Sequence, residues 1–147
     1  MIAIKPLSQT DSKWANKKIG QTALTLGRYG CTITCMAMLM DTTPDQLAKT
    51  LKFTADAKII WSNNFGKFKF SFREYKRNDP AIIDHIKDPK KAVILEVNNK
   101  SHWVIPVAYF PPSGKNPTYL IADPQDGVYK NLDVYKNITG AAYFTIK

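Results

Sequence analysis

The ten residues CTITCMAMLM, positions 31–40, are apolar on nearly every face, and Gly30 stands directly before them. A helix that is apolar all round is usually buried at the centre of a protein. The stretch therefore predicts a buried central helix that begins at Cys31. We expect Cys35, one turn further along, to be a small buried side chain, whereas Cys31 lies at the mouth of the helix.

Two further helices are expected downstream of this stretch. Thr43 suits a helix N-cap and the proline after it suits the first helical position, which predicts an amphipathic helix to about Leu51. The Asp-Pro pair at residues 79–80 begins a second short helix, which carries three isoleucines. His85 lies on that helix between charged residues, so we expect it to be exposed and inert.

Most of the remaining chain has the pattern of strands. In residues 65–75, Phe68, Phe70 and Phe72 alternate with basic and polar residues, which predicts a strand with its phenylalanines toward the core. Later apolar runs predict strands at residues 92–97, 101–110, 119–122 and 141–146, with a loop at 111–114. Helices followed by consecutive strands are typical of an α+β fold with an antiparallel sheet. A length of 147 residues without a repeat or linker predicts one domain, 1–147.

The chain is strongly basic, with a formal net charge of +9. Such a charge favours anionic partners, either an anionic polymer such as a cell wall or nucleic acid. The basic and aromatic strand at 65–77 is the candidate surface for nucleic acid. In that strand, however, alternation separates the aromatic rings from the lysines, so we do not expect nucleic acid as the partner.

The cysteine content and the N-terminus restrict the other classes. Two cysteines, Cys31 and Cys35, are too few for a disulfide scaffold, and with two histidines they make a poor zinc site. We therefore expect no metal and no cofactor. No signal peptide or membrane-spanning run is found, so we expect a protein that is cytoplasmic as synthesised and acts outside the cell only through lysis or a carrier.

The candidate catalytic residues occur in the order cysteine, histidine, aspartate. At a helix N-terminus, the thiol of Cys31 lies in the positive end of the helix dipole, which favours the reactive thiolate. His102, near the start of a predicted strand, can take the thiol proton and return it to a leaving group. Asp123 follows another strand and can orient the imidazole. It suits a turn-capping role equally well by spacing, and Asp126 is its rival.

Acyl transfer also needs donors for the oxyanion. The backbone N–H of Cys31 supplies one. Gln9 is a candidate for the second, although the residues alone hardly separate it from Gln21 or Gln46.

Four motifs together resemble the papain-like peptidases, and in particular the family related to the peptidases that process double-glycine bacteriocin leaders. They are LSQTDSKW at 7–14, RYGCTITCMAML at 28–39, SHWVI at 101–105 and LIADP at 120–124. The resemblance implies a helical half packed on a sheet half. It also implies Cys31 as nucleophile, His102 as base, Asp123 as orienting acid and Gln9 in the oxyanion hole.

The resemblance predicts a cysteine peptidase or amidase that works through a thioester. Free-standing members resemble bacterial and phage proteins, some of them described as lysis or cell-wall enzymes, which makes a peptidoglycan stem peptide a candidate substrate beside an ordinary peptide. Two alternatives remain open from the residues: a catalytically inactive papain-like binding module, and a basic nucleic-acid-binding protein. Trp61 suits a place in the substrate cleft as well as one in the core.

Overall fold

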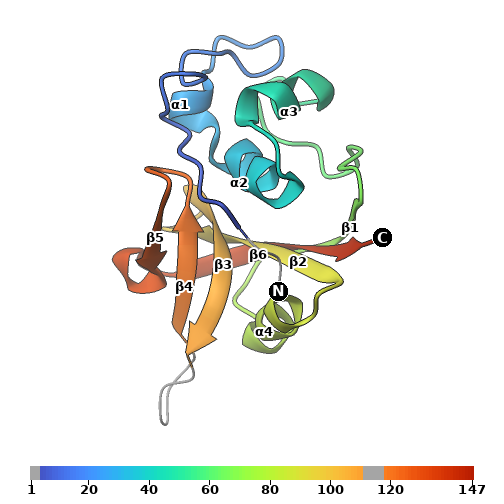
Figure 1. Cartoon of the computed structure of the whole chain (residues 1–147), viewed down its shortest axis with the longest axis vertical. Helices are drawn as coiled ribbons and strands as arrows, with labels where there is room; N and C mark the ends of the chain where they lie inside the picture. The colour runs from blue at the N-terminus through green and yellow to red at the C-terminus, as the bar shows by residue number, and fades with distance from the viewer. Residues whose placement is uncertain (1–3, 111–117) are drawn as a thin grey trace.

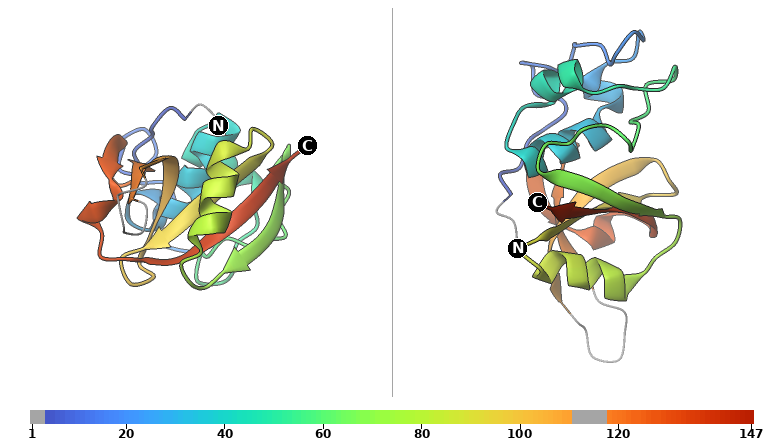
Figure 2. Two further views of the ribbon diagram at one scale, coloured as in Figure 1. Left: turned by 90° about the horizontal axis from the view of Figure 1, so that it is seen from below. Right: turned by 90° about the vertical axis from the view of Figure 1, so that its right-hand side faces the viewer.

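A computed structural model describes residues 4–110 and 118–147. Three helices lie together on one face of a sheet: α1 (Leu26–Tyr29), α2 (Cys31–Met40) and α3 (Pro44–Thr50) (Figure 1). A fourth, α4 (Asp79–Lys87), lies on the opposite face (Figure 2). The helical layer thus comes from the N-terminal part of the chain and the sheet from the rest, and the predicted loop at 111–114 lies outside the described residues.

Within the described residues, the sheet is antiparallel and has six strands in the order β1-β6-β2-β3-β4-β5. The expected α+β class is therefore confirmed. The strands are β1 (Phe68–Glu74), β2 (Lys91–Val97), β3 (His102–Phe110), β4 (Thr118–Asp123), β5 (Val128–Asn131) and β6 (Ile138–Ile146), with a 3₁₀ turn, η1 (Leu132–Val134), before the last.

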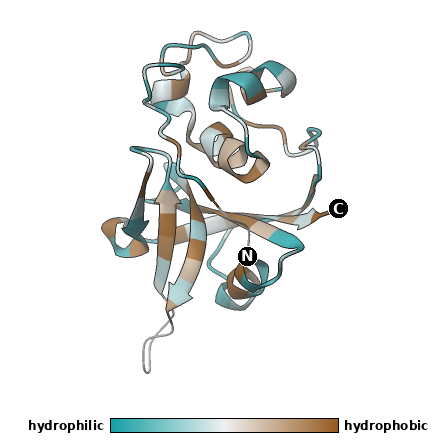
Figure 3. Ribbon diagram, viewed as in Figure 1, coloured by the Kyte–Doolittle hydropathy of each residue, from teal (hydrophilic) through white to brown (hydrophobic). Residues whose placement is uncertain are grey.

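Both faces of the sheet are buried, which explains why its central strands read as continuous apolar runs. In β2, Ala92 and Ile94 join the core beneath α2, and Val93, Leu95 and Val97 join a second core beneath α4. Figure 3 shows apolar residues gathered in α2 and along the central strands, while α3 is largely hydrophilic. The sheet therefore holds α2 in place from below.

Gly30 is required by packing between α1 and α2. A Cβ at this position would lie 2.4 Å from the carbonyl oxygen of Leu26. The glycine thus lets α2 start immediately after α1, with a break between them at Gly30, and this break leaves Cys31 as the first residue of a new helix. From Ile33 to Leu39 every residue of α2 is buried, as its composition predicts.

The phenylalanines of β1 do not all point the same way, contrary to the alternation of the sequence. Phe68 is buried and Phe70 packs on the core under α2, but Phe72 is 45% exposed. The pairing of β1 with β6 slips by one residue between Phe70 and Phe72. Such a bulge turns the following side chains to the other face, so Phe72 stacks on Tyr143 instead.

No helix among the described residues is long and apolar enough to cross a bilayer.

Candidate active site

Cys31 is the first residue of α2 and is half-buried. The first turn of α2 carries no acidic side chain and no side-chain cap. Its backbone N–H groups are therefore not neutralised by a carboxylate, and their partial positive charge acts on the sulfur. Thr32 Oγ1 lies 4.0 Å from Cys31 Sγ. The site thus offers a partly accessible thiol at the positive end of a helix.

His102 is the first residue of β3 and is buried between Cys31 and Asp123. Its Nε2 lies 2.8 Å from Asp123 Oδ1, and the ring is close enough to Cys31 for the sulfur to raise its pKa. Burial lowers the pKa of the imidazole, but the bonds with Asp123 and Cys31 outweigh it and raise the pKa of His102 to about 9. The imidazole is therefore held as a cation next to the thiol at neutral pH.

Asp123 ends β4 and is fully buried. Because β3 and β4 are antiparallel, the start of one and the end of the other meet at the same edge of the sheet. Both carboxylate oxygens of Asp123 accept hydrogen bonds. Oδ1 accepts from His102 and from the backbone of Gln125 at 2.9 Å, and Oδ2 accepts from Lys130 at 2.9 Å and from the hydroxyl of Tyr135.

These donors keep Asp123 ionised. Burial opposes its charge, but the hydrogen bonds from His102, Tyr135, Gln125 and Lys130 hold the pKa of this carboxyl well below its usual range. Asp126 does not compete for the histidine, because it is exposed and pairs with Lys130 at 2.8 Å. The geometry therefore favours Asp123 over Asp126 as the residue that orients His102.

Gln9 connects the segment that follows β4 with helix α1. Its backbone N–H donates to the carbonyl of Pro124 at 2.7 Å, and its side-chain Nε2 donates to the carbonyl of Gly27 at 3.2 Å. The side chain is buried, and its Oε1 has no partner among the described residues. A primary amide nitrogen has two hydrogens, so one remains after the bond to Gly27.

Cys35 is completely buried one turn below Cys31. Burial raises its pKa far above that of a free thiol, and the neighbouring Cys31 and Asp123 raise it further. A thiol held in its neutral form is a poor nucleophile. Cys35 is therefore the weaker of the two candidate nucleophiles.

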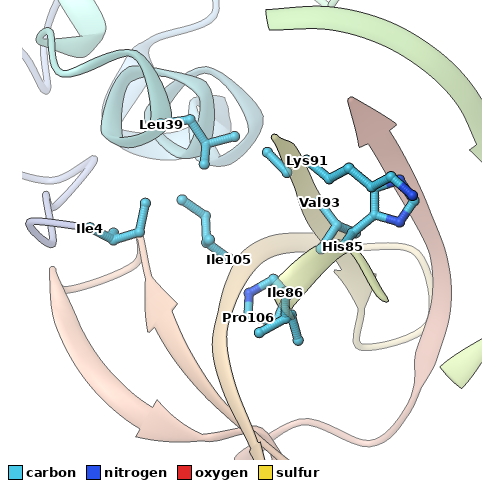
Figure 4. Close-up of a pocket in the computed structure, with 9 residues that line it drawn as sticks. Ile4, Leu39, His85, Ile86, Lys91, Val93, Ile105 and Pro106 are labelled. Atoms are coloured by element: carbon cyan, nitrogen blue, oxygen red, sulfur yellow. The ribbon is translucent and has the colours of Figure 1, made fainter. Parts of the chain in front are cut away.

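The expectation that His85 is exposed is wrong. The side chain is 8% exposed, packs on the ring of Tyr143 and bonds the carbonyl of Ala81 at 2.7 Å. It is three residues after Ile82 and next to Ile86, the buried positions of α4, so helical spacing could have shown that it faces the sheet. With Leu39, which lies near the opposite end of α2 from Cys31, it lines a shallow pocket whose empty volume of about 280 Å³ includes open solvent (Figure 4).

Sequence reasoning missed two residues of the site, Lys130 and Tyr135. Lys130 lies on β5, which the sequence did not predict, and Tyr135 follows the 3₁₀ turn; both bond the same oxygen of Asp123. The ring of Tyr135 also lies 5.2 Å from the imidazole of His102. Their only signal in the sequence is their position shortly after the Asp-Pro turn.

A large cleft borders the site, with an empty volume of about 1100 Å³ that includes open solvent. Thr32 and Trp103, which follow Cys31 and His102 in the chain, both line it. Trp61 lines it too, and it also packs on Phe70 and Phe144 of the core. Trp61 therefore lies at the boundary between the cleft and the core, the two positions that the sequence suggested for it. Among the described residues, no group of three or more His, Cys, Asp or Glu side chains is placed to hold a metal ion.

No family model, curated protein or solved structure matches this chain. What the site does must therefore be argued from its own geometry and chemistry.

Proposed function

We propose that this protein is a papain-like cysteine peptidase or amidase in which Cys31 is the nucleophile. The observation that carries the proposal is the placement of His102 between the thiol of Cys31 and the buried carboxylate of Asp123. A nucleophile, a base and a group that orients the base are the three parts of an activated nucleophilic site. They come from three separate elements, α2, β3 and β4.

Because His102 already carries a proton at neutral pH, the reaction begins from the pair in which the imidazolium holds the proton given up by the thiol of Cys31. The thiolate of Cys31 then attacks the substrate carbonyl carbon, and the carbonyl electrons move to the oxygen. As the C–N bond breaks, the imidazolium gives its proton to the leaving amine. A thioester remains on Cys31. Water, deprotonated by His102, attacks that thioester and releases the carboxylic acid and the thiol.

The oxyanion of each tetrahedral intermediate needs two donors. The backbone N–H of Cys31 is one, because the first residue of a helix has no acceptor within that helix. The remaining hydrogen on Gln9 Nε2 is the second. The hydrogen bonds of Gln9 to Pro124, after β4, and to Gly27, in α1, fix its side chain. The donor is therefore positioned before substrate arrives.

A peptide is the proposed substrate, with the stem peptide of peptidoglycan as one candidate source. The net charge of +9 supports contact with an anionic polymer such as a bacterial cell wall.

Trapping of the thioester tests the proposal. Wild-type protein is incubated with peptide libraries and with purified peptidoglycan, quenched in acid and analysed by intact mass spectrometry; in parallel, hydroxylamine converts any thioester into a substrate hydroxamate. We expect an acyl adduct on Cys31, absent in Cys31→Ala and strongly reduced in His102→Ala. Product release that persists in both variants contradicts the proposal. Peptide binding without any adduct favours the inactive binding module.

A further inference from the structure

The cleft beside Cys31 is lined by a nearly buried ion pair between Arg73 and Glu96. The bulge in β1 turns Arg73 to the face of the sheet that carries Glu96 and Trp103. There the guanidinium bonds Glu96 at 2.8 Å and lies 4.8 Å from the ring centre of Trp103 and 4.3 Å from that of Tyr75. Arg73 and Glu96 are each only about a tenth exposed.

Gly140 makes room for this ion pair. A Cβ at Gly140 would lie 2.3 Å from Arg73 Nη1 and 3.1 Å from Glu96 Oε1. The second oxygen of Glu96 is also occupied, because it accepts from the hydroxyl of Thr139 at 3.1 Å. Both oxygens of Glu96 are thus bonded within the protein, and the ion pair is held in one position. It shapes the wall of the cleft but leaves no unpaired charge to bind a ligand.

The charges around the cleft are mostly positive. Arg73, Lys58 and Lys100 line it, against the single carboxylate of Glu96. Glu96 neutralises Arg73, and Lys58 pairs with Asp56 at 3.6 Å on the surface. Within the described part of the chain, Lys100 forms no ion pair and is exposed. Lys100 is therefore the cation that remains for a ligand.

Lys100 also holds an unusual backbone conformation. The turn between β2 and β3 has three successive residues in the left-handed region, Asn98 at φ 56°, Asn99 at 55° and Lys100 at 68°. Asparagine tolerates this region, but for lysine it costs roughly 1–2 kcal/mol. Strain of this kind tends to lie at functional sites. Here it fixes a lysine at the cleft, two residues before His102.

Resting on the proposed function, we infer that the cleft selects a peptide with a carboxylate near the bond that is cleaved, and that Lys100 binds this carboxylate. The carboxylate lies on the side of Cys31 bordered by Thr32 and Trp103. Such a group is present both on acidic residues of ordinary peptides and on peptidoglycan stem peptides.

Binding is measured in Cys31→Ala protein, so that no turnover occurs. The probes are blocked hexapeptide pools in which each position in turn carries glutamate or glutamine, and muropeptides whose stem carboxylate is free or amidated. Binding is followed by the fluorescence of Trp61 and Trp103, which line the cleft. We expect the charged member to bind about three- to fivefold more tightly at one position, with a larger ratio at low salt.

Variants at Lys100 assign this preference. Lys100→Asn removes the charge but keeps a residue that suits the left-handed backbone, so the turn still folds. It should abolish the preference, and Lys100→Arg should keep it. Lys87→Asn is the matched control, because it lowers the net charge of the protein by the same amount at a site on α4, on the other face of the sheet. This variant should also retain the preference for a carboxylate. A preference for free carboxylates in hexapeptides or in muropeptides alone identifies the source of the substrate.

The inference is overturned if the charged and neutral members bind equally at every position, or if Lys100→Asn keeps the full preference. Because Cys31→Ala forms no thioester, either result counts against the carboxylate subsite alone. Wild-type protein that binds the same peptides without forming an acyl adduct counts instead against the proposed function.

Discussion

The exchange Asp123→Asn removes the carboxylate that holds His102 in its charged form. In the wild type the pKa of His102 is about 9, against an ordinary value of 6.5. At about 1.4 kcal/mol per pKa unit, the folded protein favours the imidazolium by roughly 3 kcal/mol. Burial acts against the charged form, while the hydrogen bond to Asp123 is the largest single influence that raises this pKa, followed by the interactions with Cys31.

Without that carboxylate, burial dominates and the pKa of His102 should fall by about two units or more. The assay is an NMR titration of the imidazole C–H signals, which is simple because the chain has only two histidines. Burial lowers the pKa of the other one, His85, below 6.5, so the signal that titrates on the alkaline side belongs to His102. A Cys31→Ala control measures the part contributed by the thiol.

The same exchange changes the pH dependence of stability. Because the folded pKa of His102 is raised, its stabilisation is fully present below pH 6.5 and is lost as the pH rises through about 9. The wild-type free energy of unfolding should therefore decline by roughly 3 kcal/mol across that interval, and Asp123→Asn should lack the decline. A wild-type His102 that titrates near 6.5, unmoved by Asp123→Asn, refutes the reasoning.

Three further predictions concern packing and the reaction. Gly30→Ala places a methyl group against the carbonyl of Leu26 and should destabilise the protein by about 1–3 kcal/mol, so an unchanged melting temperature contradicts the packing argument. Gln9→Glu keeps the shape but not the amide donor and should lower kcat roughly 10²- to 10³-fold; equal turnover removes Gln9 from the oxyanion hole. The rate of acyl transfer should fall as the pH rises through about 9, where His102 loses the proton needed by the leaving group, and a pH–rate profile that stays flat there contradicts this role.

The elements that the sequence predicted are those with a strong periodic or apolar signal. Residues 31–40 form a buried helix because no polar face competes for solvent. The central strands follow from apolar runs, since helices cover both faces of the sheet. The order of Cys31, His102 and Asp123 also suggested a site, and the structure brings these three residues together.

Other features have no comparable signal in one sequence. β5 is a short edge strand of four residues with an exposed, partly polar pattern, so neither it nor the lysine it contributes to Asp123 was predicted. The bulge in β1 depends on the pairing with β6, which local alternation does not encode. It is this bulge that exposes Phe72 and brings Arg73 to the cleft. Long-range pairing, rather than local preference, thus decides the surroundings of the site.

The most direct test of the central claim is the pH dependence of Cys31 alkylation by iodoacetamide, read by peptide mass spectrometry. We expect rapid labelling of Cys31 at about pH 6, well below the free-thiol pKa of about 8.5. It should be lost in His102→Ala and retained in Cys35→Ala. Labelling of Cys31 that is as slow as that of an ordinary thiol, and the same with and without His102, would contradict an activated nucleophile.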